Sequence, residues 1–86
     1  MLLICRDKTI DLNKFETVTY AENIITRGYS VMATRNGRGF LGMSSLISEE
    51  IVCLKYEKDA EELVQDITRS WIKKKDVFDV AKWIKE

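Results

Sequence analysis

The first 56 residues of the chain mix β-branched and aromatic residues with turn residues, and two segments, 9–12 and 15–20, alternate apolar and polar positions with the period of a β-strand. The segment from Phe15 to Tyr20 shows the pattern best, because Val18 and Tyr20 fall on one face while Thr17 and Thr19 fall on the other. Alternation of β-branched and aromatic residues is typical of a strand with one buried face. We therefore expect about six short strands, at residues 2–5, 9–12, 15–20, 24–35, 38–43 and 51–56, with a bend at residues 21–23.

Glycine positions predict how the middle of the chain turns. Asn36-Gly37 predicts a type I′ hairpin turn, because both residues tolerate the positive φ that this turn needs twice in succession. Ile24-Ile25 is expected to begin the strand before this turn, and Gly28 marks a bulge or bend within that strand. The polar stretch from Ser44 to Glu50 is expected to be a loop.

From Asp59 onward the apolar residues recur at the spacing of an amphipathic α-helix. Asp59 is expected to be the N-cap, and Glu62 three residues later completes a pair that resembles a capping box. Lys73-Lys74-Lys75 ends the helix, where positive charge meets the negative pole of the helix dipole. The spacing of i, i+3, i+4 and i+7 produces one apolar stripe, made of Ala60, Leu63, Val64, Ile67 and Trp71.

The tail of the chain, residues 76–86, fits two patterns. Its apolar residues suit either a short helix capped by Asp76 or a short edge strand through Val77 and Phe78. We favour a brief extended piece followed by a helical turn around Trp83.

Together these elements predict an α+β fold in one domain that spans residues 1–86. About six short antiparallel strands are expected to form a sheet or a small open barrel, followed by one amphipathic C-terminal helix that lies across it. A chain of this size buries only a thin core. Self-association is therefore a natural way to extend that core.

Charge and missing residue types exclude several classes of function. The chain carries 14 basic and 14 acidic residues, so no overall field attracts it to nucleic acid or to an anionic membrane. It contains no histidine, which removes serine–histidine and cysteine–histidine catalysis and mixed cysteine–histidine zinc sites. Neighbouring carboxylates such as Glu49 and Glu50 have no phosphate-binding loop or metal-spaced acid cluster beside them. We expect no catalytic residue, no metal and no cofactor, in a protein that is not an enzyme.

The compartment follows from the apolar runs and the cysteines. No run is long enough to span a bilayer, and the opening MLLIC lacks the basic lead and the cleavage site of a signal peptide. Cys5 and Cys53 lie in apolar runs and are expected to be buried free thiols in a reducing compartment. These features favour a cytoplasmic protein with no membrane partner.

The segment RGFLGMSS, residues 38–45, begins like the central signature of RNA recognition motifs and then departs from it. Leu41 stands where that signature has a small residue, and Gly42 and Ser45 stand where it has aromatic residues. Those aromatic rings stack on the bases, so their absence removes the mechanism as well as the pattern. The segment therefore does not predict an RNA recognition motif.

A looser nucleic-acid hypothesis rests on a basic hairpin. Arg27, Arg35 and Arg38 lie in a stretch without acidic residues, and Phe40 is close to them in sequence. Such a surface can follow a phosphate backbone. We favour the simpler interpretation that these arginines are solvated and keep a sheet edge from pairing wrongly.

Two aromatic residues of the tail, Trp83 and Phe78, are the candidate contacts with a protein partner. Aromatic residues that are partly exposed are enriched at protein interfaces. We expect a small non-catalytic protein-interaction module that self-associates as a homo-oligomer or binds another protein. The alternative is a weak nucleic-acid-binding protein that uses the basic hairpin.

The layout also has a resemblance. The hairpin YSVMATRNGRGFLG is followed by IVCLKYEKDAEELVQDITRSWIKKK and then by VFDV. This order resembles small uncharacterised proteins of phages and Gram-positive bacteria that consist of an antiparallel sheet and one C-terminal helix. The resemblance implies that fold and an origin in a mobile element, and it carries over no functional residue. A pleckstrin-homology-like or other small barrel is one way for such a sheet to close.

Overall fold

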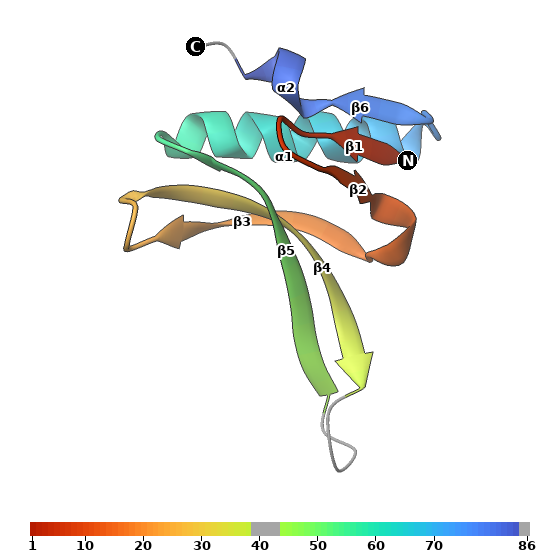
Figure 1. Ribbon diagram of the computed structural model, residues 1–86, viewed down its shortest axis with the longest axis horizontal. Helices are drawn as coiled ribbons and strands as arrows, with labels where there is room; N and C mark the ends of the chain where they lie inside the picture. Colours follow the sequence, from red (N-terminus) through yellow and green to blue (C-terminus); the bar gives the residue numbers. More distant parts are fainter. Residues whose placement is uncertain (39–43, 85–86) are drawn as a thin grey trace.

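Two small open sheets and one long helix share a single apolar core (Figure 1). The computed structural model of the protein describes residues 1–38 and 44–84. In these residues the elements are β1 (Leu2–Ile4), β2 (Thr9–Asp11), the 3-10 turn η1 (Leu12–Lys14), β3 (Thr17–Asn23), β4 (Gly28–Arg38), β5 (Ser44–Leu54), α1 (Glu57–Ile72), β6 (Val77–Asp79) and α2 (Val80–Trp83).

The larger sheet is antiparallel, with the strand order β3-β4-β5. β4 and β5 have 11 residues each and β3 has seven, so β4 continues past the point where β3 begins. The pairing of β4 with β5 shifts between Val31 and Met32, which places a bulge there. The last residues of β4 and the first residues of β5 extend away from the rest of the protein (Figure 1).

The smaller sheet, with the order β2-β1-β6, joins the two ends of the chain. β1 pairs antiparallel with β2 and parallel with β6, where Leu3 lies opposite Phe78. The backbone N–H of Leu2 also donates a 2.8 Å hydrogen bond to the carbonyl of Asp76. The expectation that all strands are antiparallel is therefore wrong for one pair. β6, which follows α1, returns to β1 and pairs with it in parallel.

The core lies where the apolar stripe of α1 meets both sheets. Ala60, Leu63 and Ile67 of α1 are fully buried, as the helical spacing predicts. They share one cluster with residues of both sheets and of α2, namely Leu3, Ile10, Val31, Ala33, Ile51 and Val80. Removing this stripe from water is the main driving force for the fold.

The predicted hairpin joins β4 to β5, but its turn is not at Asn36-Gly37. Asn36 and Gly37 belong to β4 and pair with Leu46 and Ser45 of β5, so the predicted loop at residues 44–50 is a strand. The connection, residues 39–43, lies outside the described residues, as does most of the strand expected at 38–43. Residues 46–50 are all exposed, which explains why a strand there has the polar composition of a loop.

The strand before this hairpin also differs from the prediction. β3 occupies Thr17–Asn23, so the bend expected at residues 21–23 is wrong. Ile24 and Ile25 lie in the turn that follows, and β4 begins only at Gly28. A Cβ at Gly28 would approach the carbonyl oxygen of Leu54 to 2.5 Å, so glycine is needed for the close pairing with β5.

The helix begins three residues earlier than predicted. Its N-cap is Tyr56, which makes no side-chain capping hydrogen bond, and the predicted cap Asp59 lies in the first turn with Glu57. The buried stripe begins at Ala60, whose N–H bonds to the carbonyl of Tyr56, so the preceding turn must already be helical. The carboxylates of Glu57 and Asp59 still favour this end, because they lie at the positive pole of the dipole.

The helix ends at the predicted lysines in a Schellman motif. The N–H of Lys74 bonds to the carbonyl of Trp71, and the N–H of Lys75 bonds to the carbonyl of Ser70. This arrangement needs a left-handed residue, and Lys74 occupies it with φ 58°. A lysine at this position is strained where glycine would not be.

The tail follows the favoured pattern, because the extended β6 leads into one helical turn that ends at Trp83. Asp79 caps α2, since its side chain accepts a hydrogen bond from the N–H of Lys82. The main helix is therefore central in the fold and not its last element. Neither sheet closes on itself, so the barrel alternative is wrong. No helix in the described part of the chain is long and apolar enough to cross a membrane.

Ile67→Asp tests the packing of α1. Ile67 is fully buried, so the substitution places an unpaired charge in the core. The cost, roughly 3–5 kcal/mol, removes most of the stability of a domain of this size. Circular dichroism and thermal melting should show an unfolded or severely destabilised protein, whereas Gln65→Asp on the exposed face should melt close to the wild type. Unchanged melting of the Ile67 variant would refute this packing.

Lys74→Gly tests the strained helix end. Glycine adopts the left-handed conformation without a Cβ penalty, so we expect the free energy of unfolding to rise by about 1 kcal/mol. The matched control is Lys73→Gly, which removes the same charge at a residue with an ordinary φ of −74° and should destabilise. Urea denaturation measures both variants, and a Lys74 variant less stable than the wild type would contradict the expectation.

Candidate protein-interaction site

The predicted basic residues do not all share one surface. Arg27 is exposed in the turn between β3 and β4, with a left-handed φ of 58°. Arg35 is exposed eight residues further along, which corresponds to roughly 26 Å of extended chain. Arg38 ends β4, but its side chain lies outside the described residues, and so does Phe40. Arg27 is therefore separated from the arm of the hairpin that carries Arg35.

The surroundings of Arg35 carry charges of both signs. Arg35 lines a hollow of about 480 Å³ together with Asp11, Lys14 and Glu49. Glu49 also lies 3.8 Å from the ammonium group of Lys8. The positive charge of this arm is therefore offset by neighbouring carboxylates, which weakens the attraction to a phosphate backbone.

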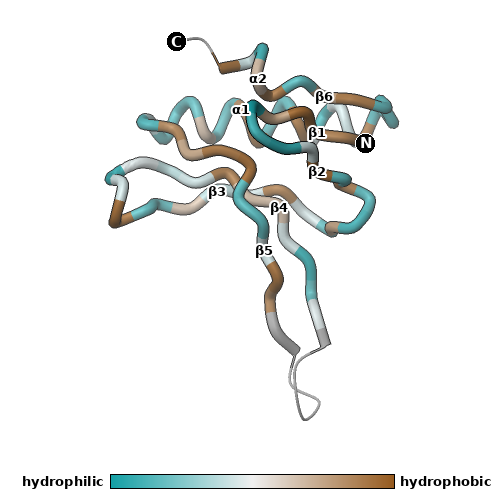
Figure 2. The backbone as a smooth tube through the Cα atoms, viewed as in Figure 1, coloured by the Kyte–Doolittle hydropathy of each residue, from teal (hydrophilic) through white to brown (hydrophobic). Residues whose placement is uncertain are grey.

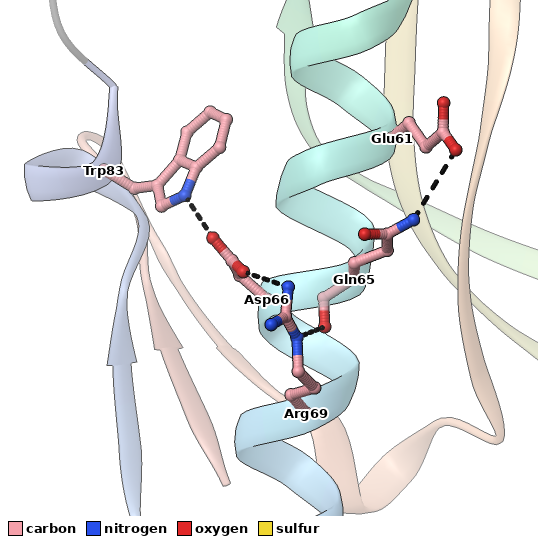
Figure 3. A network of polar contacts seen from close by, with 5 residues as sticks. All are labelled: Glu61, Gln65, Asp66, Arg69 and Trp83. Carbon is pink, nitrogen blue, oxygen red and sulfur yellow. Dashed lines mark hydrogen bonds and ion pairs between the residues drawn. The ribbon is translucent and has the colours of Figure 1, made fainter.

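The two predicted aromatic contacts, Trp83 and Phe78, are both half-buried and pack against the core. The indole N–H of Trp83 donates a 2.9 Å hydrogen bond to Oδ2 of Asp66, whose Oδ1 accepts from Arg69 at 2.9 Å (Figure 3). These contacts attach α2 to the side of α1. Trp83 and Phe78 thus have a structural role, and their contact with a partner stays a prediction.

The outer edge of β3 is the least protected strand edge in the described residues. β3 is the first strand of its sheet. One of its edges pairs with β4, and its outer edge pairs with no strand among residues 1–38 and 44–84. β2 and β6 are edges of only three residues, and β5 carries Glu49, Glu50 and a bulge. Short length, charge and bulges all protect an edge from pairing. β3 has seven residues and a single charged one, Glu22.

A groove lies between the beginning of β3 and the end of α1, and we call it the β3–α1 groove. Its volume is about 440 Å³. Ile72 is 74 % exposed beside it, and Trp71 is half-buried. The residues that line it are Glu16, Thr17, Val18, Thr68, Trp71 and Ile72. A strand edge next to an apolar groove under a helix is the arrangement that takes up an extended peptide in β-strand addition.

An exposed apolar turn lies at the other end of β3, where Figure 2 shows a hydrophobic segment. Ile24 is 86 % exposed and Ile25 is 94 % exposed, which are the largest exposures among the apolar residues described. Oδ1 of Asn23 accepts hydrogen bonds from the N–H groups of Ile25 and Thr26. The amide group of Asn23 donates to Oγ of Ser30 at 3.1 Å. The two isoleucines are therefore displayed on a turn with a fixed conformation.

The free edge of β3 and the apolar turn were missed by sequence patterns because both need the fold to define them. Ile24-Ile25 has the composition of a strand, and only its position after β3 shows that it is a turn. The sequence did contain a signal for Ile72. It follows Trp71 in the helix, so it points about 100° away from Trp71 around the helix axis and lies outside the buried stripe. An apolar residue beside the stripe indicates a surface that something else can cover.

The remaining hollows surround α2 and the cysteines. A cleft of about 590 Å³ contains Asp59, Glu62 and Asp66 of α1 together with Lys82, and an adjoining cleft of about 720 Å³ contains Cys5 and Cys53. Among the described residues no group of three or more cysteine or carboxylate side chains could hold a metal ion. Both thiols are free; Cys5 is buried, as predicted, and Cys53 is only half-buried.

Comparisons with protein-family models, with curated protein sequences and with solved structures found no match for this chain. The site is therefore defined by its geometry alone.

The two thiols should differ in reactivity. Burial raises the pKa of Cys5 and outweighs the opposing effect of Lys8, so little thiolate forms near neutral pH. Iodoacetamide should therefore modify Cys53 well before Cys5 in the folded protein, as measured by mass spectrometry of peptides over time. In guanidinium the two rates should converge. Equal rates in the folded protein would show that Cys5 is not shielded.

Proposed function

We propose that the protein is a non-catalytic interaction module that binds an extended polypeptide segment along the outer edge of β3. The observation that carries the proposal is the long, nearly uncharged edge of β3 beside the apolar β3–α1 groove. Backbone N–H and C=O groups of the edge supply affinity for any extended chain. The groove supplies preference for a segment with an apolar side chain.

The exposure of Ile72 supports this proposal. An isoleucine that is 74 % exposed gains little from its position in the free protein, although its neighbour Trp71 packs on the core. Burial of a large aliphatic side chain stabilises a complex by about 1.5–3 kcal/mol when it is complete. Covering Ile72 and the adjoining surface of Val18 therefore favours binding of an apolar side chain.

The nucleic-acid alternative has less support. Arg27 and Arg35 lie far apart along the sheet, and Asp11 and Glu49 lie close to Arg35. A basic stripe with aromatic platforms is the usual requirement for binding single strands. The residues described around Arg35 include carboxylates as well as basic groups, whereas a basic stripe has positive charges alone.

Peptide selection tests the proposed function. Random peptides displayed on phage are selected on the immobilised wild-type protein, and the enriched peptides are titrated into isotope-labelled protein. We expect extended sequences with alternating apolar residues, and the amide shifts they cause should follow β3. Ile72→Glu should weaken their binding by about tenfold or more, because it places a charge in the groove.

Leu46→Glu is the matched control. Leu46 is 69 % exposed on β5, so the same kind of substitution is made on an apolar residue outside the groove. Its peptide affinity should equal that of the wild type. Peptides that bind both variants alike, or that shift amides of another element, would refute the proposed site.

A further inference from the structure

We infer that the segment that occupies the β3 edge is β3 of a second copy of this chain, paired antiparallel about a two-fold axis. This inference rests on the proposed function, because it names the partner of the same site. The β3–α1 groove flanks the first residues of β3, and the exposed Ile24-Ile25 follows its last residue. Antiparallel pairing of two copies brings the beginning of one β3 to the end of the other, so each apolar turn meets the other copy's groove.

Symmetry limits the possible registers. Directly opposite residues of an antiparallel pair point to the same face of the sheet. Under a two-fold axis perpendicular to the sheet, two residues that pair across the copies must therefore differ in residue number by an even number. One residue of β3 then pairs with its own copy, and the axis passes between these two copies. Only an axis at Thr19, Tyr20 or Ala21 pairs most of the seven residues of β3.

Charge disfavours two of these three registers. An axis at Thr19 places Glu16 directly opposite Glu22, once on each side of the axis. Like charges directly opposite each other destabilise a pair of strands. An axis at Tyr20 places Val18 opposite Glu22, which brings a carboxylate to the apolar groove and leaves it there without a partner.

The register with the axis at Ala21 has neither fault. It pairs residues 19–23 of the two copies. The Ile24-Ile25 turn that follows then lies beside the beginning of the other copy's β3, where Val18 and Thr17 line the β3–α1 groove. Burial of these two exposed isoleucines against the apolar groove favours the complex. Ala21 is exposed and small, so the two copies of it at the axis leave room for close approach.

The apolar turn is already fixed for this contact. Asn23 holds the backbone of Ile25 and Thr26 through its side-chain oxygen, and Ser30 continues the network by donating to Glu50 at 2.8 Å. A segment that is ordered before binding loses less conformational entropy on association. The pairing produces one six-stranded antiparallel sheet, with α1 of both copies on the same face.

Complementary charges at the axis test this inference. In Ala21→Lys the two introduced ammonium groups lie directly opposite, on α-carbons about 4.5–5.5 Å apart. We expect the dimer dissociation constant to rise by roughly tenfold or more. Ala21→Glu should have the same effect. An equimolar mixture of the two variants should form a dimer again, because each site then pairs a lysine with a glutamate.

The measurement is sedimentation velocity over a range of concentrations, with circular dichroism to check that each variant is folded. Thr19→Lys is the matched control, because it adds the same charge on the same exposed face two residues away, where it lies opposite Asn23. It should dimerise like the wild type. A Thr19 variant that dissociates while the Ala21 variant does not would overturn the register.

A wild-type protein that stays monomeric at hundreds of micromolar would overturn the inference altogether, and so would an Ala21→Lys variant that dimerises as the wild type does. Peptide selection separates this failure from failure of the proposed function. If the protein is a monomer and its β3 edge still selects extended peptides, the proposed function stands and only the inference that the partner is a second copy is refuted. A monomer that selects none loses both.

Discussion

Burial of one face of α1 is the interaction on which the rest of the structure depends. Ala60, Leu63 and Ile67 are fully buried, and the core that covers them draws residues from both sheets. A chain of 86 residues has few strands available for this task. The larger sheet consequently has three strands, and the outer edge of β3 has no strand to pair with among the described residues. The site that we propose is thus a consequence of how a small core is covered.

Local patterns predicted those parts of the fold that local interactions determine. The helix, its apolar stripe and its end at the lysines follow from spacing, and so does the extended piece before Trp83. The parallel pairing of β1 with β6 could not be predicted, because neither strand's sequence shows which neighbour it will have. The strand at residues 44–50 could not be predicted, because residues 46–50 are exposed and the segment therefore has the polar composition of a loop.

The candidate site was harder to predict than the fold. Phe78 and Trp83 were chosen as partly exposed aromatics of the tail, but the pairing with β1 and the hydrogen bond to Asp66 bring them against the core. Conversely, the sequence predicted a strand near β3 but not that its outer edge is unpaired. Which strands lie at an edge depends on the order of strands in the sheet, and that order is not visible in the sequence of one strand. Ile24 and Ile25 resembled the start of a strand, and only the placement of Asn23 identifies them as a displayed turn.

The parallel pair in the smaller sheet has a consequence for the order of folding. Leu2 pairs with Val77, so this contact closes a loop of nearly the whole chain, whereas the β4–β5 hairpin and α1 form from residues close in sequence. Contacts between distant residues carry the larger loop-closure cost and form slowly. During synthesis on the ribosome, β1 can pair with β2 at once, but its other edge stays open until the residues of β6 have emerged.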